Sequence, residues 1–155
     1  MDKVRFGVIG IGNMGTGHVG WLGGGEIEGA TLTAVCDIKP SRLDWVRANV
    51  KGEVAFFDDY TALLDSGLCD AVIIATPHYY HPIIGIEAFK RGVAVISEKP
   101  VGVYTKKVRE FIAAADASGL PFGVMYNQRT NPQYAKMREL VRSGALGQLK
   151  RCIWI

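Results

Sequence analysis

Short apolar runs alternate with amphipathic segments along almost the whole chain. The runs at 71–75 and 93–96 contain no polar residue, a pattern typical of strands buried on both faces of a sheet. The pattern predicts strands at 4–9, 32–36, 54–57, 71–75, 93–96 and 122–125. It predicts helices at 13–23, 41–49, 59–66, 80–90, 104–118 and 132–143.

This alternation of strands and helices predicts an α/β fold. Short strands separated by helices form βαβ units, and right-handed crossovers then give a doubly wound parallel sheet. Ligands of such sheets bind at the carboxyl ends of the strands. Residues 149–155 also have strand composition, and they either pair within the same domain or begin a further one.

A glycine-rich turn lies where the first predicted strand passes into the first predicted helix. Gly10 allows the tight turn, Gly12 lets the backbone approach a pyrophosphate, and Gly15 lets the helix pack closely on the strand. The free N–H groups at the start of that helix favour a phosphate. We therefore expect a dinucleotide site that includes Gly10, Ile11, Gly12, Asn13, Met14 and Gly15.

Asp37 strengthens this prediction, because three glycines alone are weak evidence in a chain with 19 of them. It ends the second predicted strand, 22 positions after Gly15, where a carboxylate accepts the ribose 2′-OH of NAD. Lys39 and Arg42 are placed to hold a 2′-phosphate, but Asp37 would repel that group. The cofactor is therefore expected to be NAD rather than NADP.

Two further polar groups follow the apolar strands at 71–75 and 93–96. The first comprises Thr76, Pro77, His78 and His81, and the second comprises Glu98, Lys99 and Pro100. At the carboxyl edge of a parallel sheet both groups would face the cofactor. Lys99 would then act as an acid or base toward a substrate hydroxyl. The alternative is an ordinary surface ion pair between Glu98 and Lys99.

The remaining histidines and tryptophans suggest no other chemistry. His78 and His81 lack an obvious third ligand nearby, so no metal site is expected. His18, alone on the first predicted helix, is expected to be structural or exposed. Trp21 and Trp45 are expected in the core, because no basic groove accompanies them.

Composition excludes several other classes of protein. The 155 residues are 48% hydrophobic, which is enough for one domain with a core. The net charge of +3 comes without a basic run, so no nucleic-acid partner is expected. No apolar run reaches the ~18 residues of a membrane helix, and no signal-peptide pattern is present. Three widely spaced cysteines are expected to be free thiols, which predicts a cytoplasmic protein.

These motifs together resemble the N-terminal half of the glucose-fructose oxidoreductase / inositol dehydrogenase (Gfo/Idh/MocA) family, whose first domain is a Rossmann-type fold. The combination of Thr-Pro-x-x-x-His-Pro with Glu-Lys-Pro is more specific than the glycines. The resemblance covers nearly the whole chain and is carried by residues 10–15, 37, 75–82, 98–100, 127–132 and 143–150. One departure is His78, where the family commonly has asparagine.

The resemblance implies hydride transfer between a nicotinamide and a small-molecule polyol, sugar or inositol. It implies that Lys99 is the catalytic lysine, that Glu98 lies near the nicotinamide ribose and that Asn127 contacts the cofactor. It divides the chain into a dinucleotide-binding domain at 1–147 and, at 148–155, the first strand of a second domain. That second domain carries the family's substrate pocket, a catalytic histidine and most of its oligomer contacts, so a homo-oligomer is expected and the present residues alone are expected to be inactive.

Two other functions stay open at this level. Some relatives sense the dinucleotide as regulators without turning it over, although the intact Lys99 argues against that function here. Others cleave glycosides through a transient oxidation of the sugar.

Overall fold

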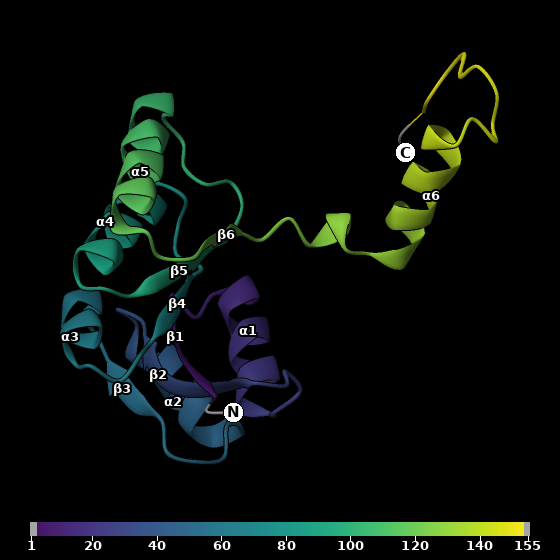
Figure 1. Cartoon of the computed structure of the whole chain (residues 1–155). Helices are drawn as coiled ribbons and strands as arrows, with labels where there is room; N and C mark the ends of the chain where they lie inside the picture. The colour runs from purple at the N-terminus through teal and green to yellow at the C-terminus, as the bar shows by residue number, and fades with distance from the viewer. Residues whose placement is uncertain (1–2, 154–155) are drawn as a thin grey trace. The chain divides into compact units, whose positions relative to one another are not determined.

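The computed structural model describes residues 3–153 and confirms the doubly wound α/β fold (Figure 1). Six parallel strands form one sheet in the order β3-β2-β1-β4-β5-β6. They are β1 (Val4–Ile9), β2 (Ala30–Cys36), β3 (Ala55–Phe57), β4 (Ala71–Ile74), β5 (Ala94–Ser97) and β6 (Phe122–Val124). The strand order changes direction between β1 and β4, which is where such sheets bind ligands.

The helices begin and end close to the predicted bounds. They are α1 (Asn13–Gly23), α2 (Pro40–Asn49), α3 (Tyr60–Asp65), α4 (His81–Lys90), α5 (Thr105–Ser118), the 3₁₀ turn η1 (Asn127–Arg129) and α6 (Pro132–Arg142). Local chemistry explains several of these ends. The Asp59 carboxylate caps α3 by accepting the N–H of Ala62 at 2.9 Å, and Gly119 ends α5 with a left-handed φ of 65°.

Each face of the sheet packs on its own set of helices. Val8 and Ile73 belong to a cluster with residues of α1 and α2, whereas their neighbours Ile9 and Ile74 pack with residues of α3, α4 and α5. Successive strand residues point to opposite faces, so both faces are buried. This explains the unbroken apolar strands in the sequence.

Trp21 differs from its expected place in the core. It is 45% exposed, because the buried positions of α1 are Gly15, His18, Val19 and Leu22, at helical spacing. Trp45 is partly buried against the cluster of α1 and α2, in closer agreement with the prediction.

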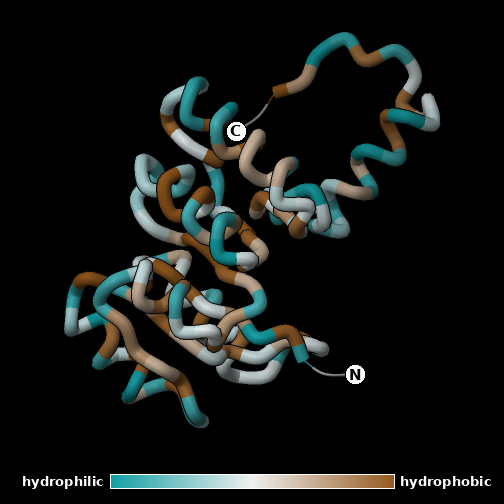
Figure 2. The backbone as a smooth tube through the Cα atoms, turned by 60° about the vertical axis from the view of Figure 1, so that its left-hand side comes forward, coloured by the Kyte–Doolittle hydropathy of each residue, from teal (hydrophilic) through white to brown (hydrophobic). Residues whose placement is uncertain are grey.

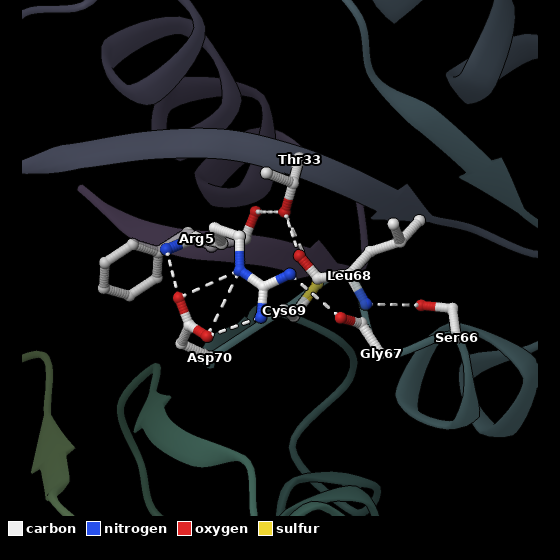
Figure 3. A network of polar contacts seen from close by, with 8 residues as sticks. Arg5, Thr33, Ser66, Gly67, Leu68, Cys69 and Asp70 are labelled. Atoms are coloured by element: carbon white, nitrogen blue, oxygen red, sulfur yellow. Dashed lines mark hydrogen bonds and ion pairs between the residues drawn. The ribbon is translucent and has the colours of Figure 1, made fainter. Parts of the chain in front are cut away.

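A polar network joins β1 to the loop before β4, and its contacts are drawn in Figure 3. The Arg5 guanidinium donates to Asp70 Oδ1 at 2.7 Å and to the Gly67 carbonyl at 3.0 Å, and the Arg5 backbone N–H donates to Asp70 Oδ2 at 2.8 Å. Thr33 Oγ1 donates to the Leu68 carbonyl at 2.8 Å. These contacts hold the loop at the amino end of the sheet, opposite the edge where ligands bind.

The chain divides into two compact units, the first ending at Met125 and the second beginning at Tyr126. The second unit contains η1, α6 and the segment that follows them, and none of the residues of α6 is buried. Figure 2 shows hydrophobic positions recurring through α6 and that segment, where Met137, Leu146 and Ile153 are exposed.

The strand expected at 149–155 does not form over 149–153, and 154–155 lie outside the described residues. A strand needs a neighbouring strand for its hydrogen bonds, and the described part of the second unit contains none. Among residues 3–153, no helix has the length and apolar character needed to cross a bilayer.

Candidate functional site

The three glycines of the turn between β1 and α1 differ in what a side chain would meet there. Gly10 has a φ of +90°, and a Cβ there would lie 2.8 Å from the backbone of Ala75. A Cβ on Gly15 would lie 1.8 Å from the Gly10 carbonyl oxygen, so the helix could not approach the turn. A Cβ on Gly12 would meet no atom within 4 Å. Packing therefore requires Gly10 and Gly15, whereas Gly12 leaves open space in front of the helix.

That open space lies at the start of α1. Gly12 is the N-cap residue and offers no side chain to cap the first turn. The exposed residues Asn13 and Met14 begin the helix. Their N–H groups and the positive end of the helix dipole suit a phosphate group, as the sequence predicts.

Asp37 links the end of β2 to this turn. Its Oδ2 accepts the Ile11 N–H at 2.7 Å, and its Oδ1 accepts the Lys39 N–H at 2.9 Å. Each carboxylate oxygen retains a second acceptor position for a ribose hydroxyl. The Ile11 side chain is fully buried and its N–H is bonded to Asp37, and its expected contact with the cofactor stays a prediction.

A cavity of about 420 Å³ lies at this carboxyl edge. Its lining includes Gly12, Asp37, Lys39, Tyr60, Thr76 and Tyr80. Thr76 Oγ1 is buried there and has no hydrogen-bond partner among the described residues. A buried hydroxyl without a partner is costly, which makes Thr76 a candidate contact for a polar ligand in the cavity.

Cys36 also lines the cavity, and its thiol is held in the protonated form, which is the less nucleophilic one. Burial, reinforced by the nearby carboxylates of Asp59 and Asp37, raises the pKa of the Cys36 thiol to about 12. Burial likewise raises the pKa of the Cys69 thiol. Both thiols are free and protonated at neutral pH, and Cys152 is free and exposed.

Lys99 follows β5 at the same edge of the sheet. Its side chain is exposed, and its Nζ has no ion-pair or hydrogen-bond partner within the described part of the chain. The neighbouring Glu98 is 4% exposed and does not pair with it. The alternative of a surface Glu98–Lys99 ion pair is therefore wrong, and the lysine amine is free for other chemistry.

Glu98 pairs instead with His18, a contact that the sequence analysis missed. His18 Nε2 and Glu98 Oε1 lie 2.8 Å apart, and both side chains are 5% exposed. The residues are 80 positions apart, so no local pattern joins them. The one available signal is that His18 lies three residues after Gly15, on the buried face of α1.

His81 has a different place from the expected one. Its ring is fully buried, with Nδ1 2.8 Å from the Pro100 carbonyl oxygen and Nε2 2.8 Å from the Thr76 carbonyl oxygen. Each ring nitrogen faces a backbone carbonyl, so His81 links the two loops and its ring is enclosed, whereas a place facing the cofactor was expected. His78 is exposed, with its ring centroid 5.6 Å from that of His81, and stays a candidate together with Pro77.

Two further expectations concern Asn127 and metals. Asn127 begins η1 in the second unit, where its carbonyl accepts the Thr130 hydroxyl at 2.9 Å, and its cofactor role stays a prediction. Residues 3–153 contain no group of three or more His, Cys, Asp or Glu side chains able to hold a metal ion.

Comparison with known sequences identifies relatives of the chain. Residues 4–126 match a family model described as an oxidoreductase family with an NAD-binding Rossmann fold. The chain is 32% identical over 153 residues to inositol 2-dehydrogenase 1 of Saccharopolyspora erythraea, covering 97% of this chain and 45% of that protein. It is 29% identical over 150 residues to the rhizopine catabolism protein MocA of Rhizobium meliloti, covering 96% and 45%. The chain thus spans less than half the length of these relatives.

Comparison with solved structures also finds dehydrogenases, and they share the fold of this chain. Scyllo-inositol dehydrogenase from Lactobacillus casei, with bound NAD(H) and scyllo-inositol, superposes with a TM-score of 0.89 at 26% identity, covering 95% of this chain and 43% of that one. The WlbA dehydrogenase from Bordetella pertussis, in complex with NADH and UDP-GlcNAcA, gives a TM-score of 0.84 at 28% identity, covering 94% and 44%.

Proposed function

Because the chain belongs to the oxidoreductase family with an NAD-binding Rossmann fold, we propose that it is the cofactor-binding half of an NAD-dependent dehydrogenase acting on a polyol. The reacting group is a CH–OH of an inositol, a sugar or a related alcohol. The observation that carries this proposal is the free amine of Lys99 at the carboxyl edge of the sheet. The inositol dehydrogenases among its relatives support the substrate class.

The residues of the cavity fit a nicotinamide dinucleotide. The open space at Gly12 and the uncapped first turn of α1 suit its pyrophosphate. Asp37 has acceptor positions for the adenosine ribose, and Thr76 Oγ1, which has no partner among residues 3–153, would gain one from a polar ligand. The charge of Asp37 disfavours a 2′-phosphate, which supports NAD over NADP.

A bound NAD⁺ supplies the hydride acceptor for this reaction. The protein supplies the proton chemistry, since the substrate hydroxyl must lose its proton as its carbon loses a hydride. Lys99 Nζ takes or relays that proton. A protein that only senses the dinucleotide has no need of a free lysine amine at this place, which favours a dehydrogenase over a regulator.

Three broader proposals accompany this function. Residues 1–147 serve as the dinucleotide-binding domain, and 148–155 form the first strand of a substrate domain once neighbouring strands of that domain are present to pair with it. The protein is a homo-oligomer, a proposal supported by the exposed apolar residues Leu146, Leu149 and Ile153. It works in the cytoplasm, in keeping with its free cysteines.

A calorimetric titration of the chain with NADH and NADPH tests the cofactor assignment. We expect NADH to bind with the lower Kd. Equal or reversed affinities would contradict the role of Asp37, and no binding of either nucleotide would contradict the proposed function.

A further inference from the structure

We propose that His18 is a positioning residue for the reaction, holding the Lys99 turn in place through the carboxylate of Glu98. The inference rests on the proposed function, in which Lys99 handles the substrate proton. His18 belongs to α1, whose first turn is proposed to receive the pyrophosphate, whereas Lys99 follows β5. The contact therefore joins the two halves of the proposed site.

The Glu98 carboxylate is held from both of its oxygens. Oε1 accepts the Nε2–H of His18 at 2.8 Å, and Oε2 accepts the backbone N–H of Lys99 at 3.1 Å. A buried carboxylate is costly unless it is paired and hydrogen-bonded, so this geometry leaves the carboxylate one favourable position. Its position then fixes the Lys99 backbone.

The backbone of the same turn is held at its other end. The Glu98 N–H donates to the Ile74 carbonyl at 2.9 Å, and Ser97 Oγ donates to the Glu98 carbonyl at 3.0 Å. Beyond Lys99, the Pro100 carbonyl lies 2.8 Å from His81 Nδ1. Because Lys99 Nζ has no partner among the described residues, the direction of its side chain depends on this backbone. A small shift of the turn would move the amine away from the substrate hydroxyl.

The test compares two substitutions at His18. His18→Gln keeps an N–H donor near the position of Nε2, whereas His18→Leu removes the donor. Backbone hydrogen exchange, measured by NMR on the whole chain, reports the hydrogen bond of the Lys99 amide directly. The Ile74 amide in β4 serves as the internal reference for global stability.

We expect His18→Leu to speed exchange of the Lys99 amide about tenfold relative to Ile74, the effect of losing a hydrogen bond to a charged group. His18→Gln should restore slow exchange. Equal exchange at Lys99 in the wild type and both variants would overturn the proposal, and so would fast exchange in both variants.

A second pair of variants controls for misfolding, because His18→Leu leaves the buried Glu98 carboxylate without one of its hydrogen-bond donors. In Glu98→Gln the buried group is neutral, its carboxamide oxygen can still accept the Lys99 N–H, and its NH₂ can donate to His18 Nε2 in the tautomer that carries the ring proton on Nδ1. Adding His18→Leu to Glu98→Gln therefore removes the same contact without burying an unpaired charge. We expect faster exchange at Lys99 in the double variant than in Glu98→Gln alone, and no difference would overturn the proposal.

A kinetic measurement separates positioning from simple stability. In the complete protein that carries this chain, His18→Leu should lower kcat by about 10²-fold with the NADH Kd unchanged, and His18→Gln should recover most of the rate. A loss of NADH affinity in parallel with kcat would overturn the positioning role. Failure of the wild-type chain to bind NADH is a separate result that overturns the proposed function, since the exchange experiment needs no cofactor.

Discussion

Asp37 Oδ2 accepts the backbone N–H of Ile11 at 2.7 Å, so the carboxylate that ends β2 also fixes the glycine turn that ends β1. The same side chain is proposed to bind the ribose and to exclude the 2′-phosphate of NADP. Its substitution therefore affects both cofactor selection and the shape of the turn, and an experiment has to separate the two effects.

Two substitutions of Asp37 make this separation. Asp37→Asn removes the charge and keeps one oxygen to accept the Ile11 N–H, although its NH₂ then faces the Lys39 N–H. The preference for NADH over NADPH should narrow, and stability should fall less than in Asp37→Ser. Asp37→Ser is too short to reach the Ile11 N–H, and leaving that donor unbonded should also lower the free energy of unfolding by about 1–3 kcal/mol. Calorimetry and urea denaturation measure the two quantities. If both variants kept the wild-type preference for NADH over NADPH, Asp37 would not be the residue that selects the cofactor.

Gly12 and Gly15 offer a matched pair of substitutions in one turn. Gly12→Ala places its Cβ in open space, so the melting temperature should stay unchanged while the NADH Kd rises, because the methyl group occupies the proposed pyrophosphate position. Gly15→Ala places its Cβ 1.8 Å from the Gly10 carbonyl oxygen and should destabilise the fold itself. Thermal melts with and without NADH measure both effects. Unchanged NADH affinity in Gly12→Ala would place the pyrophosphate elsewhere.

Thr76 and Thr33 provide a second matched comparison. Thr76 Oγ1 has no partner among residues 3–153, so Thr76→Val should leave stability without cofactor equal or higher, yet weaken NADH binding by about 0.5–1.5 kcal/mol. Thr33 Oγ1 donates to the Leu68 carbonyl, so Thr33→Val should lower stability and leave NADH binding unchanged. Denaturation and calorimetry on both variants measure this. The idea that Thr76 donates to the cofactor would fail if Thr76→Val bound NADH as the wild type does.

Asp70 should make stability depend on pH at the opposite end of the sheet. Hydrogen bonds from the side chain and the backbone N–H of Arg5 hold the pKa of the Asp70 carboxyl below its usual value. Because the folded state favours the ionised carboxylate, its contribution is present above the unfolded pKa of about 3.9 and is lost as the pH falls through the lower folded value.

The measurement compares the wild type with Asp70→Asn by urea denaturation between pH 7 and pH 2. The wild type should be more stable at pH 7, and the difference should shrink toward low pH. It should stay small, and smaller still at high salt, because both side chains are 45% exposed. A difference independent of pH would mean that the charge of Asp70 contributes nothing.

The fold, and the cavity at the carboxyl edge of its sheet, could be predicted from sequence because both depend on local patterns. Strand β1 and helix α1 have the predicted bounds, since the apolar run and the glycines are adjacent in the chain. The glycine turn, Asp37 and Thr76 all reach one cavity, because parallel strands bring their carboxyl ends to one edge.

The roles of the buried polar groups could not be predicted, because they depend on contacts distant in sequence. His81 was expected to face the cofactor, but its ring is buried between the carbonyls of Thr76 and Pro100. In the sequence His18 has no polar partner nearby, but in the structure its Nε2 lies 2.8 Å from Glu98 Oε1. Composition likewise predicted a strand at 149–155, but the described part of the second unit supplies no neighbouring strand.

The central claim, that Lys99 handles the substrate proton in an NAD-dependent dehydrogenase, is tested most directly by steady-state reduction of NAD⁺ in the complete protein that carries this chain. Inositols and sugars serve as substrates, and the wild type is compared with Lys99→Ala. We predict that kcat falls by roughly 10²–10⁴-fold while the NADH Kd changes little, because an acid–base group is lost and the cofactor contacts are kept. Turnover of the same substrates by Lys99→Ala at the wild-type rate would contradict the account.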